Sequence, residues 1–256
     1  MLAQDIKDAE LVLVGIGSEM QVKLQTLEKI PEFTEKLSEL EAEQGKDWLR
    51  PFLIRYFLKK EYHPQIVNAY ESLKRLLEEK NYFIVSLSSD DLIKETAFRE
   101  DRIVIPCGTY HVLQCENNCA GKLFPLEDDF RMKVRGWILG KVSLAELNEP
   151  KCPDCGESLV MNQYGQTAYN EEGYLKNWQI YTKWLQGTVN RKLCIVELGV
   201  GMEYPSIIRW PFEKVCFYNQ KSVFWRVHSS LWQLSEEIKM RGKSVKENPI
   251  IFLNGQ

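Results

Sequence analysis

Residues 115–119 read CENNC and residues 152–155 read CPDC, with 32 residues between the two segments. Each segment is short enough to form a tight turn, which brings two thiolates to one side of a metal ion. A tetrahedral zinc ion bound by four sulfurs needs two such turns that face each other. The pattern therefore predicts a zinc site, whose ligands are Cys115, Cys119, Cys152 and Cys155.

Two disulfides, or four unrelated buried thiols, would leave the same cysteine pattern. The chain has seven cysteines, an odd number, and its first long apolar run, residues 11–17, lacks a basic leader and is too short to span a membrane. We therefore expect a cytoplasmic protein, in which disulfides are rare and zinc is the preferred interpretation. Because four sulfurs leave no open coordination position for water, the site should be structural.

The overall composition is that of an ordinary globular protein and narrows the choice of partners. The chain has 256 residues, of which 44% are hydrophobic and 27% are charged. Its net charge of −3 at pH 7 argues against nucleic acid as a partner, since phosphate binding needs a basic face. We expect no membrane partner, and one large domain or a large domain with a small insert.

A first glycine turn follows an apolar run at residues 11–18, LVLVGIGS. A buried strand that ends in Gly-x-Gly is typical of the start of a dinucleotide-binding fold, because glycine lets the backbone approach a pyrophosphate. The third glycine of the usual fingerprint is missing, and Glu19 places a carboxylate where phosphates would bind. An ordinary strand-to-helix turn explains this stretch equally well.

A second strand-to-glycine turn occurs at residues 193–201, LCIVELGVG. Ligands of open parallel sheets bind at such carboxyl ends. The other predicted strands are residues 82–87, 102–105, 158–162, 215–219 and 223–228, with an exposed strand around Arg131, Lys133 and Arg135. The predicted helices are residues 19–44, 47–60 with a bend at Pro51, 64–80, 92–98 and 171–186. Strands that alternate with helices predict a parallel α/β sheet.

These features together resemble the sirtuins. The segment Gly15-Ile16-Gly17-Ser18 stands where sirtuins have a Gly-Ala-Gly turn, and residues 86–91 stand where they have Thr-Gln-Asn-Ile-Asp-Gly. Cys107-Gly108 stands at their His-Gly pair. The phrases EDRIVIPCGTYHVLQCENNC (100–119), CPDCGESLVMN (152–162) and CIVELGVGMEYPSIIRWPFEKV (194–215) are most similar to the macrodomain-linked branch of the family. The resemblance is good over residues 82–218 and poor over residues 19–62.

The resemblance implies a Rossmann-like parallel sheet, the sirtuin fold, with a small inserted zinc-binding module and a helical insert. We expect residues 1–114 and 159–256 to form the NAD-binding domain and residues 115–158 the zinc module. Residues 19–62 would be the helical insert.

The resemblance also implies NAD⁺ chemistry. Sirtuins cleave the nicotinamide–ribose bond and pass ADP-ribose to an acyl oxygen, which gives deacylation, or to a protein side chain. The macrodomain-linked branch resembles protein ADP-ribosyltransferases that modify lipoyl-carrier proteins. The implied partners are therefore NAD or ADP-ribose and a protein substrate, with a lipoyl-carrier protein as the candidate.

The residues that match the family's site positions are carried over one by one. The positions of catalytic residues hold Cys107, Ser88 and Asp90. The implied cofactor-binding residues are Gly15, Ile16, Gly17, Ser18, Ser88, Asp90, Gly199, Val200, Gly201 and Asn219.

The chain departs from the family at two of these catalytic positions. Cys107 replaces the catalytic His, or the Gln of the macrodomain-linked branch, and Ser88 replaces an Asn that orients ribose; Asp90 is retained. A thiol near its ordinary pKa is a poor base for a sugar hydroxyl, although a thiolate is a nucleophile. His111 lies on the same face of an extended strand as Cys107, but about 9–14 Å away, so a partly buried strand histidine is preferred over a Cys/His pair.

Three functions remain open at this stage. The chain is an NAD-dependent protein-modifying transferase with an altered site, or a catalytically inactive sirtuin-fold protein that binds NAD, ADP-ribose or a partner protein. The third is a thiol enzyme that depends on Cys107.

Overall fold

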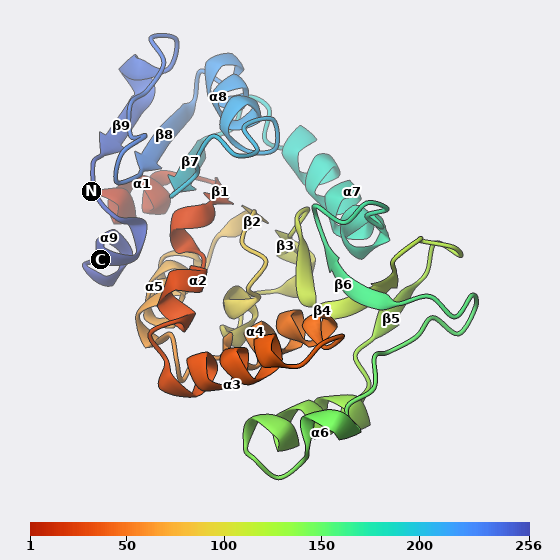
Figure 1. Cartoon of the computed structure of the whole chain (residues 1–256). Coiled ribbons are helices and arrows are strands. Elements are labelled where there is room, and N and C mark those ends of the chain that lie inside the picture. The colour runs from red at the N-terminus through yellow and green to blue at the C-terminus, as the bar shows by residue number, and fades with distance from the viewer.

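A six-stranded parallel sheet forms the centre of the molecule in the computed structural model, which describes residues 1–256 (Figure 1). Its strands, in spatial order, are β3 (Ile103–Val104), β2 (Asn81–Ser86), β1 (Leu11–Ile16), β7 (Leu193–Leu198), β8 (Ser222–Val227) and β9 (Gly242–Val245). Every residue of β1 and β7 is buried. Their continuous apolar runs are what a parallel sheet covered on both faces requires.

The register of the central strands places three turns at one edge of the sheet. Ile16, the last residue of β1, lies opposite Ser86 of β2 and Leu198 of β7. The chain passes from β1 outward to β2 on one side and returns through β7 on the other. This is the switch point at which open parallel sheets bind their ligands.

Alternate side chains of the strands supply two cores, one on each face of the sheet. Val12 and Val14 belong to the larger core, and Leu11 and Leu13 to the smaller one. The helices that bury side chains in the larger core include α1 (Leu2–Asp8), α5 (Pro64–Leu77) and α9 (Pro249–Asn254). The smaller core is covered by α7 (Glu172–Gln186) and α8 (Arg209–Tyr218).

The prediction of a strand at residues 215–219 is wrong. These residues form the last turn of α8 and the residue after it. Valine, phenylalanine and tyrosine favour strands locally, but Phe212 and Cys216, four residues apart, are both fully buried on one face of a helix. Burial of that face on the sheet outweighs the local preference.

A second, antiparallel sheet carries the cysteine pairs. Its spatial order is β5 (Leu123–Pro125), β4 (Gly108–Cys115) and β6 (Leu159–Gln163), and α6 (Asp128–Ile138) lies between β5 and β6 in the chain. Two of its strands therefore extend beyond the predicted module of residues 115–158. We refer to residues 108–163 as the small module.

The exposed strand predicted around residues 131–135 is also wrong, because these residues lie in α6. The alternation of basic side chains there satisfies helical spacing instead: Lys133 forms an ion pair with Asp129, four residues earlier, at 2.8 Å. Asp128 and Asp129 also lie in the first turn, where carboxylates stabilise a helix.

The helical insert is divided by two prolines. It contains α2 (Leu24–Leu27), α3 (Pro31–Ala42) and α4 (Arg50–Phe57). Pro31 and Pro51 each lie in the first turn of a helix, so Pro51 begins α4 and does not bend a longer helix. Short 3-10 helices complete the fold: η1 (Ser18–Met20), η2 (Asp47–Leu49), η3 (Leu92–Glu95), η4 (Glu100–Arg102), η5 (Leu144–Glu146) and η6 (Lys239–Arg241). None of the helices combines the length and apolar character needed to cross a membrane.

Candidate functional site

The two glycine turns meet at the carboxyl edge of the parallel sheet. The amide of Gly17 donates to Leu198 O at 2.9 Å, and the amide of Glu19 donates to Gly199 O at 3.3 Å. A Cβ atom on Gly17 would lie 2.1 Å from Gly199 O, so only glycine permits this approach of the two backbones. The sequence predicted both turns, and the structure brings them into direct contact.

Gly15 and Ile16 lie in β1, before the turn. A Cβ atom on Gly15 would lie 2.5 Å from Ile208 Cγ2 and 2.9 Å from Phe212 Cε2, so this glycine allows α8 to pack on the sheet. Ile16 is fully buried in the core on the other face. Of the four residues in the first predicted segment, only Gly17 and Ser18 are therefore at the turn.

Two carboxylates occupy the surface of the glycine turns. Ser18 Oγ donates to Glu203 Oε1 at 2.9 Å, and Ser229 N donates to Glu19 Oε2 at 3.1 Å. A Cβ atom on Gly201 would lie 2.2 Å from Glu203 Oε2. The sequence drew attention to Glu19 but not to Glu203, which follows the second turn by two residues.

His228, which the sequence did not single out, lies beside Glu19 without a positive charge. Its Nδ1 accepts from the amides of Ser230 at 3.1 Å and Leu231 at 3.0 Å, so this nitrogen carries no proton. Burial also lowers the pKa of His228. Although Nδ1 lies 3.3 Å from Glu19 Oε1, the neutral ring does not compensate the carboxylate.

Asp90 connects the loop after β2 to the segment that follows the first glycine turn. Its Oδ2 accepts from Val22 N at 2.8 Å and its Oδ1 from Leu92 N at 3.1 Å. Burial raises the pKa of Asp90, while the two amide donors oppose this shift. The next residue, Asp91, has φ +61°, the left-handed conformation, at the place where the sirtuin motif has Gly.

Ser88, Tyr70 and Asp90 form a buried polar group, in which burial raises the pKa values of Tyr70 and Asp90 and the Ser88 hydroxyl opposes this shift. The hydroxyls of Ser88 and Tyr70 lie close to Asp90, whose charge, after burial, helps to raise the pKa of Tyr70.

Cys107 is a buried, neutral thiol. Its side chain is 7% exposed, and burial raises its pKa to about 11. At neutral pH it is neither a base nor a thiolate nucleophile.

His111 does not activate this thiol, because it faces other groups. Its Nε2 lies 3.5 Å from Asp91 Oδ2, and its Nδ1 lies 3.5 Å from an Arg55 nitrogen. The side chain of His111 is 46% exposed, so the prediction of a partly buried histidine is wrong. Partial desolvation, together with Lys94 and Arg55, lowers the pKa of His111 to about 4. A thiol enzyme that depends on Cys107 would therefore lack His111 as its base.

A group of tyrosines that the sequence did not indicate surrounds Cys107. Tyr164, after β6, packs on Tyr204, after β7, with ring centroids 5.0 Å apart, and also on Tyr169 at 6.0 Å. The Tyr169 hydroxyl donates to Pro106 O at 2.9 Å. Aromatic contacts thus join the small module to the loop that follows the second glycine turn.

Asn219 does not join the site. It precedes β8, and therefore lies at the amino edge of the parallel sheet, opposite the glycine turns. Its Nδ2 donates to Thr188 O and Arg191 O, both at 3.1 Å, which connects two loops at that edge. Its assignment to the cofactor is corrected to a structural role.

Arg209 supports the second glycine turn, a role that no sequence pattern indicated. Its guanidinium donates to Val200 O at 2.7 Å and to Leu231 O at 2.8 Å. Nearby, Arg226 donates to the buried Glu197 at 2.7 Å and to Glu213 at 2.8 Å. These charged hydrogen bonds fix the loop that contains Gly199 and Gly201.

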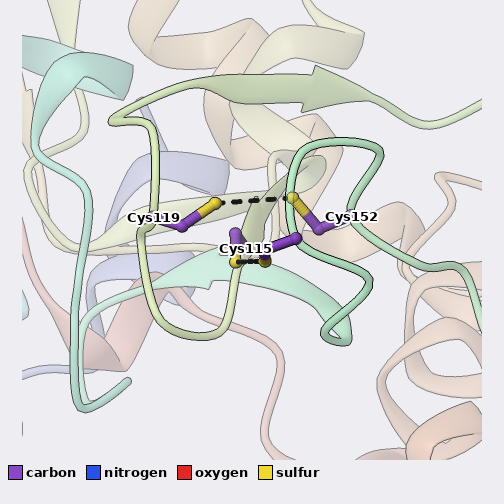
Figure 2. Close-up of side chains that lie close together, drawn as sticks. Cys115, Cys119 and Cys152 are labelled. Atoms are coloured by element: carbon purple, nitrogen blue, oxygen red, sulfur yellow. Dashed lines mark hydrogen bonds between the residues drawn. The ribbon is translucent and has the colours of Figure 1, made fainter.

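The four predicted cysteine ligands converge in the small module (Figure 2). Their sulfur atoms all lie within 4.8 Å of one another, with Cys115–Cys155 at 3.5 Å and Cys119–Cys152 at 3.7 Å. A zinc ion with Zn–S bonds of about 2.3 Å gives sulfur–sulfur edges of roughly 3.8 Å, so the cluster could hold this metal. All four are free cysteines.

The glycine turns lie at the edge of the sheet where a dinucleotide would bind, but they are packed against each other. Gly17 and Gly199 stand at the switch point, but Gly17 packs on the backbone of Gly199, and Gly199 packs on Glu19. The amides of Gly17, Glu19 and Gly199 all donate to backbone carbonyls. Glu19 and Glu203 add negative charge at the same place. The site therefore matches such a cofactor in its position and in the Ser18 hydroxyl, while the bonded amides and the two carboxylates oppose binding.

Comparison with known proteins supports the fold that the sequence suggested. No family model matches the chain. It is 20% identical to "Protein ADP-ribosyltransferase" of Staphylococcus aureus over 94% of this chain and 81% of the relative. It is 26% identical to a Fusarium oxysporum protein described as a "Probable bifunctional ADP-ribose hydrolase/ADP-ribosyltransferase", over 51% of this chain but only 23% of that protein.

Solved structures give the same result at the level of the fold. Sir2Tm bound to a propionylated peptide superposes with a TM-score of 0.53 at 13% identity, covering 98% of this chain and 94% of that one. A Sir2 homologue in complex with NAD superposes with a TM-score of 0.54 at 11% identity, covering 99% and 90%. The chain therefore has the sirtuin fold, as predicted.

Proposed function

We propose that this sirtuin-fold chain is an NAD-dependent protein-modifying transferase, and more specifically a protein ADP-ribosyltransferase. The contact between the two glycine turns carries the proposal, because it forms at the switch point of the sheet next to the Asp90 loop. The activities named for the Staphylococcus aureus and Fusarium relatives agree with it.

The residues that would hold NAD follow from their positions. Gly17, Ser18 and Gly199 lie where a diphosphate would bind, the Ser18 hydroxyl is the donor that it would use, and Ser88 and Asp90 lie in the adjacent loop. When bound, NAD⁺ supplies the ADP-ribosyl group for transfer.

The state of Cys107 favours transfer to a protein side chain over deacylation. Deacylation in this fold needs a base that activates a ribose hydroxyl. A thiol whose pKa is about 11 does not supply one near pH 7, and His111 faces Asp91 and Arg55 instead. A lipoyl-carrier protein is the acceptor that we would test first.

A second candidate function is binding of a nucleotide or a partner protein without turnover. The carboxylates that oppose the charge of NAD favour this function. Glu19 and Glu203 place negative charge at the glycine turns, and Cys107 is neutral. Such a site binds a nucleotide weakly and has no evident base.

Isothermal titration followed by a turnover assay separates the two functions. The transferase should bind NAD⁺ and ADP-ribose and release nicotinamide when a lipoyl-carrier protein is present. Binding without nicotinamide release from any acyl or lipoyl protein would support the second function. If neither nucleotide binds, both NAD-based functions are rejected.

We also propose that the cluster of Cys115, Cys119, Cys152 and Cys155 holds one structural zinc ion. The support is that two sulfur pairs lie 3.5 Å and 3.7 Å apart, near the edge of a ZnS₄ tetrahedron of roughly 3.8 Å, and that all four sulfurs lie within 4.8 Å of one another. With all four positions filled by sulfur, this metal would stabilise the small module and take no part in transfer.

A further inference from the structure

We infer that Glu203 occupies the place of a ligand's phosphate at the glycine turns, so that diphosphate nucleotides bind only when this carboxylate moves away. The inference rests on the proposed nucleotide site and adds a residue that sets its selectivity. It concerns ligands whose charge lies in a diphosphate, such as ADP-ribose and NAD⁺.

The hydrogen bond between Ser18 and Glu203 is the first support. Ser18 Oγ is the side-chain donor of the first glycine turn, and it donates to Glu203 Oε1 at 2.9 Å. A phosphate oxygen at this turn would need the same donor. Glu203 therefore satisfies, from within the chain, the group that a ligand would use.

The position of the carboxylate over the second turn is the next support. Glu203 Oε2 lies 2.2 Å from where a Cβ atom of Gly201 would be, so the side chain folds back over its own loop. The carboxylate thus covers both turns at once, since it also reaches Ser18 from the first. A diphosphate at the same place would meet a full negative charge at close range.

Glu203 can move, whereas Glu19 cannot. Glu203 is exposed, and its one side-chain hydrogen bond is that from Ser18. The side chain of Glu19 is 14% exposed, accepts from Ser229 N, and has its Cβ packed on Gly199. Rotation of the Glu203 side chain is therefore the change that opens the turns, while Glu19 remains as a fixed charge.

The test compares Glu203→Gln with wild type by isothermal titration with ADP-ribose. The amide keeps the shape of the side chain but removes its charge, so ADP-ribose should bind about tenfold more tightly or better. Glu78→Gln is the matched control, because Glu78 is exposed and lies at the end of α5, away from the carboxyl edge. It makes the same change in net charge and should leave the affinity unchanged.

Two further readouts identify repulsion as the cause. The affinity difference between wild type and Glu203→Gln should narrow as salt concentration rises, because salt screens exposed charges. Adenosine, which has no phosphate, should bind both proteins equally.

The outcomes separate failure of this inference from failure of the proposed function. If wild type binds ADP-ribose and Glu203→Gln binds it no more tightly, Glu203 does not compete with phosphate, and the nucleotide site stands. If neither protein binds ADP-ribose or NAD⁺, both the site and the role of Glu203 are rejected. Thermal unfolding of each variant confirms that the chain is folded.

Discussion

Cys107 illustrates how a residue's surroundings decide the chemistry of its side chain. Burial raises the pKa of this thiol from 9.0 to about 11, so its thiolate fraction at pH 8 is roughly a hundredfold smaller than for an exposed thiol. The sequence identified the position, but a residue type alone does not report burial. A thiol with this pKa does not take over the role of a catalytic base.

The first prediction concerns the reactivity of Cys107. At pH 8, iodoacetamide should modify Cys107 in the folded chain at least about 100-fold more slowly than in urea, because the thiol is buried and neutral. Peptide mass spectrometry resolves Cys107 from the other cysteines. Rapid alkylation of the native chain would contradict the raised pKa.

The same pKa shift gives a sign for the effect of pH on stability. The folded chain keeps its proton to about pH 11, whereas the unfolded thiol loses it near 9. Between these values the folded state binds more protons, so this residue lowers the free energy of unfolding as the pH rises. Cys107→Ser should remove that part of the alkaline loss, as measured by urea unfolding at pH 8 and pH 10.

Individual site residues were only partly predictable. Gly17 and Ser18 follow a strand pattern that is visible in the sequence, and the structure places them at the turn. Glu203 reaches Ser18 across 185 residues of chain, and no local pattern reports such a contact. Asn219 ends the segment 215–219, which was predicted as a strand; this segment is the end of α8 instead, and its place before β8 puts Asn219 at the amino edge of the sheet.

At the scale of elements, the sequence patterns that few structures can satisfy gave the correct predictions. The buried runs of β1 and β7 and the two cysteine pairs were recognised, since few other structures need these patterns. The errors at residues 131–135 and 215–219 fell on segments where strand-like composition competes with helical packing. In both cases helical contacts, invisible in the local composition, decided the structure.

The second prediction concerns the cysteine cluster. Purified chain should contain about one zinc per molecule by elemental analysis, and Cys155→Ser should lose it, because three sulfurs leave the coordination shell incomplete. Loss of a structural metal falls in the range of about 4 kcal/mol or more, which corresponds to a drop of roughly 8–16 °C in the unfolding temperature.

Cys216→Ala is the control for this experiment. Cys216 is also a buried free cysteine, but it lies in α8 and outside the cluster. This variant should lose some packing and keep its zinc. Wild-type chain with far less than one equivalent of zinc would reject the metal site, whatever the stability of the variants.

At the scale of the whole molecule, the helical insert joins the two sheets. Helix α4 of the insert contacts α6 of the small module (Figure 1). Phe52 of α4 packs on Phe130 of α6 with ring centroids 4.9 Å apart, and Trp137 Nε1 donates to Glu39 of α3 at 2.9 Å. At the other end of the insert, Val22 N donates to Asp90 in the loop after β2. The insert thus contacts the small module at one end and the edge of the proposed site at the other. The sequence did not predict this connection, because each contact joins residues far apart in the chain and residues 19–62 resemble sirtuins poorly.

The third prediction tests whether the contact between insert and small module is energetically real. Phe52 is 5% exposed, so Phe52→Ala should cost about 3 kcal/mol of unfolding free energy, and Phe130→Ala less, because Phe130 is only half-buried. The double variant should cost about 0.5–1.5 kcal/mol less than the sum, since an edge-to-face ring pair contributes this much beyond its buried area. Urea unfolding of wild type, the two single variants and the double variant provides the double-mutant cycle.

Phe52→Ala combined with Phe252→Ala serves as the control, because Phe252 lies in α9 and packs on Trp225, so these two effects should simply add. If Phe52 and Phe130 are additive as well, the two rings do not stabilise each other, and the connection rests on other contacts such as the hydrogen bond from Trp137 to Glu39.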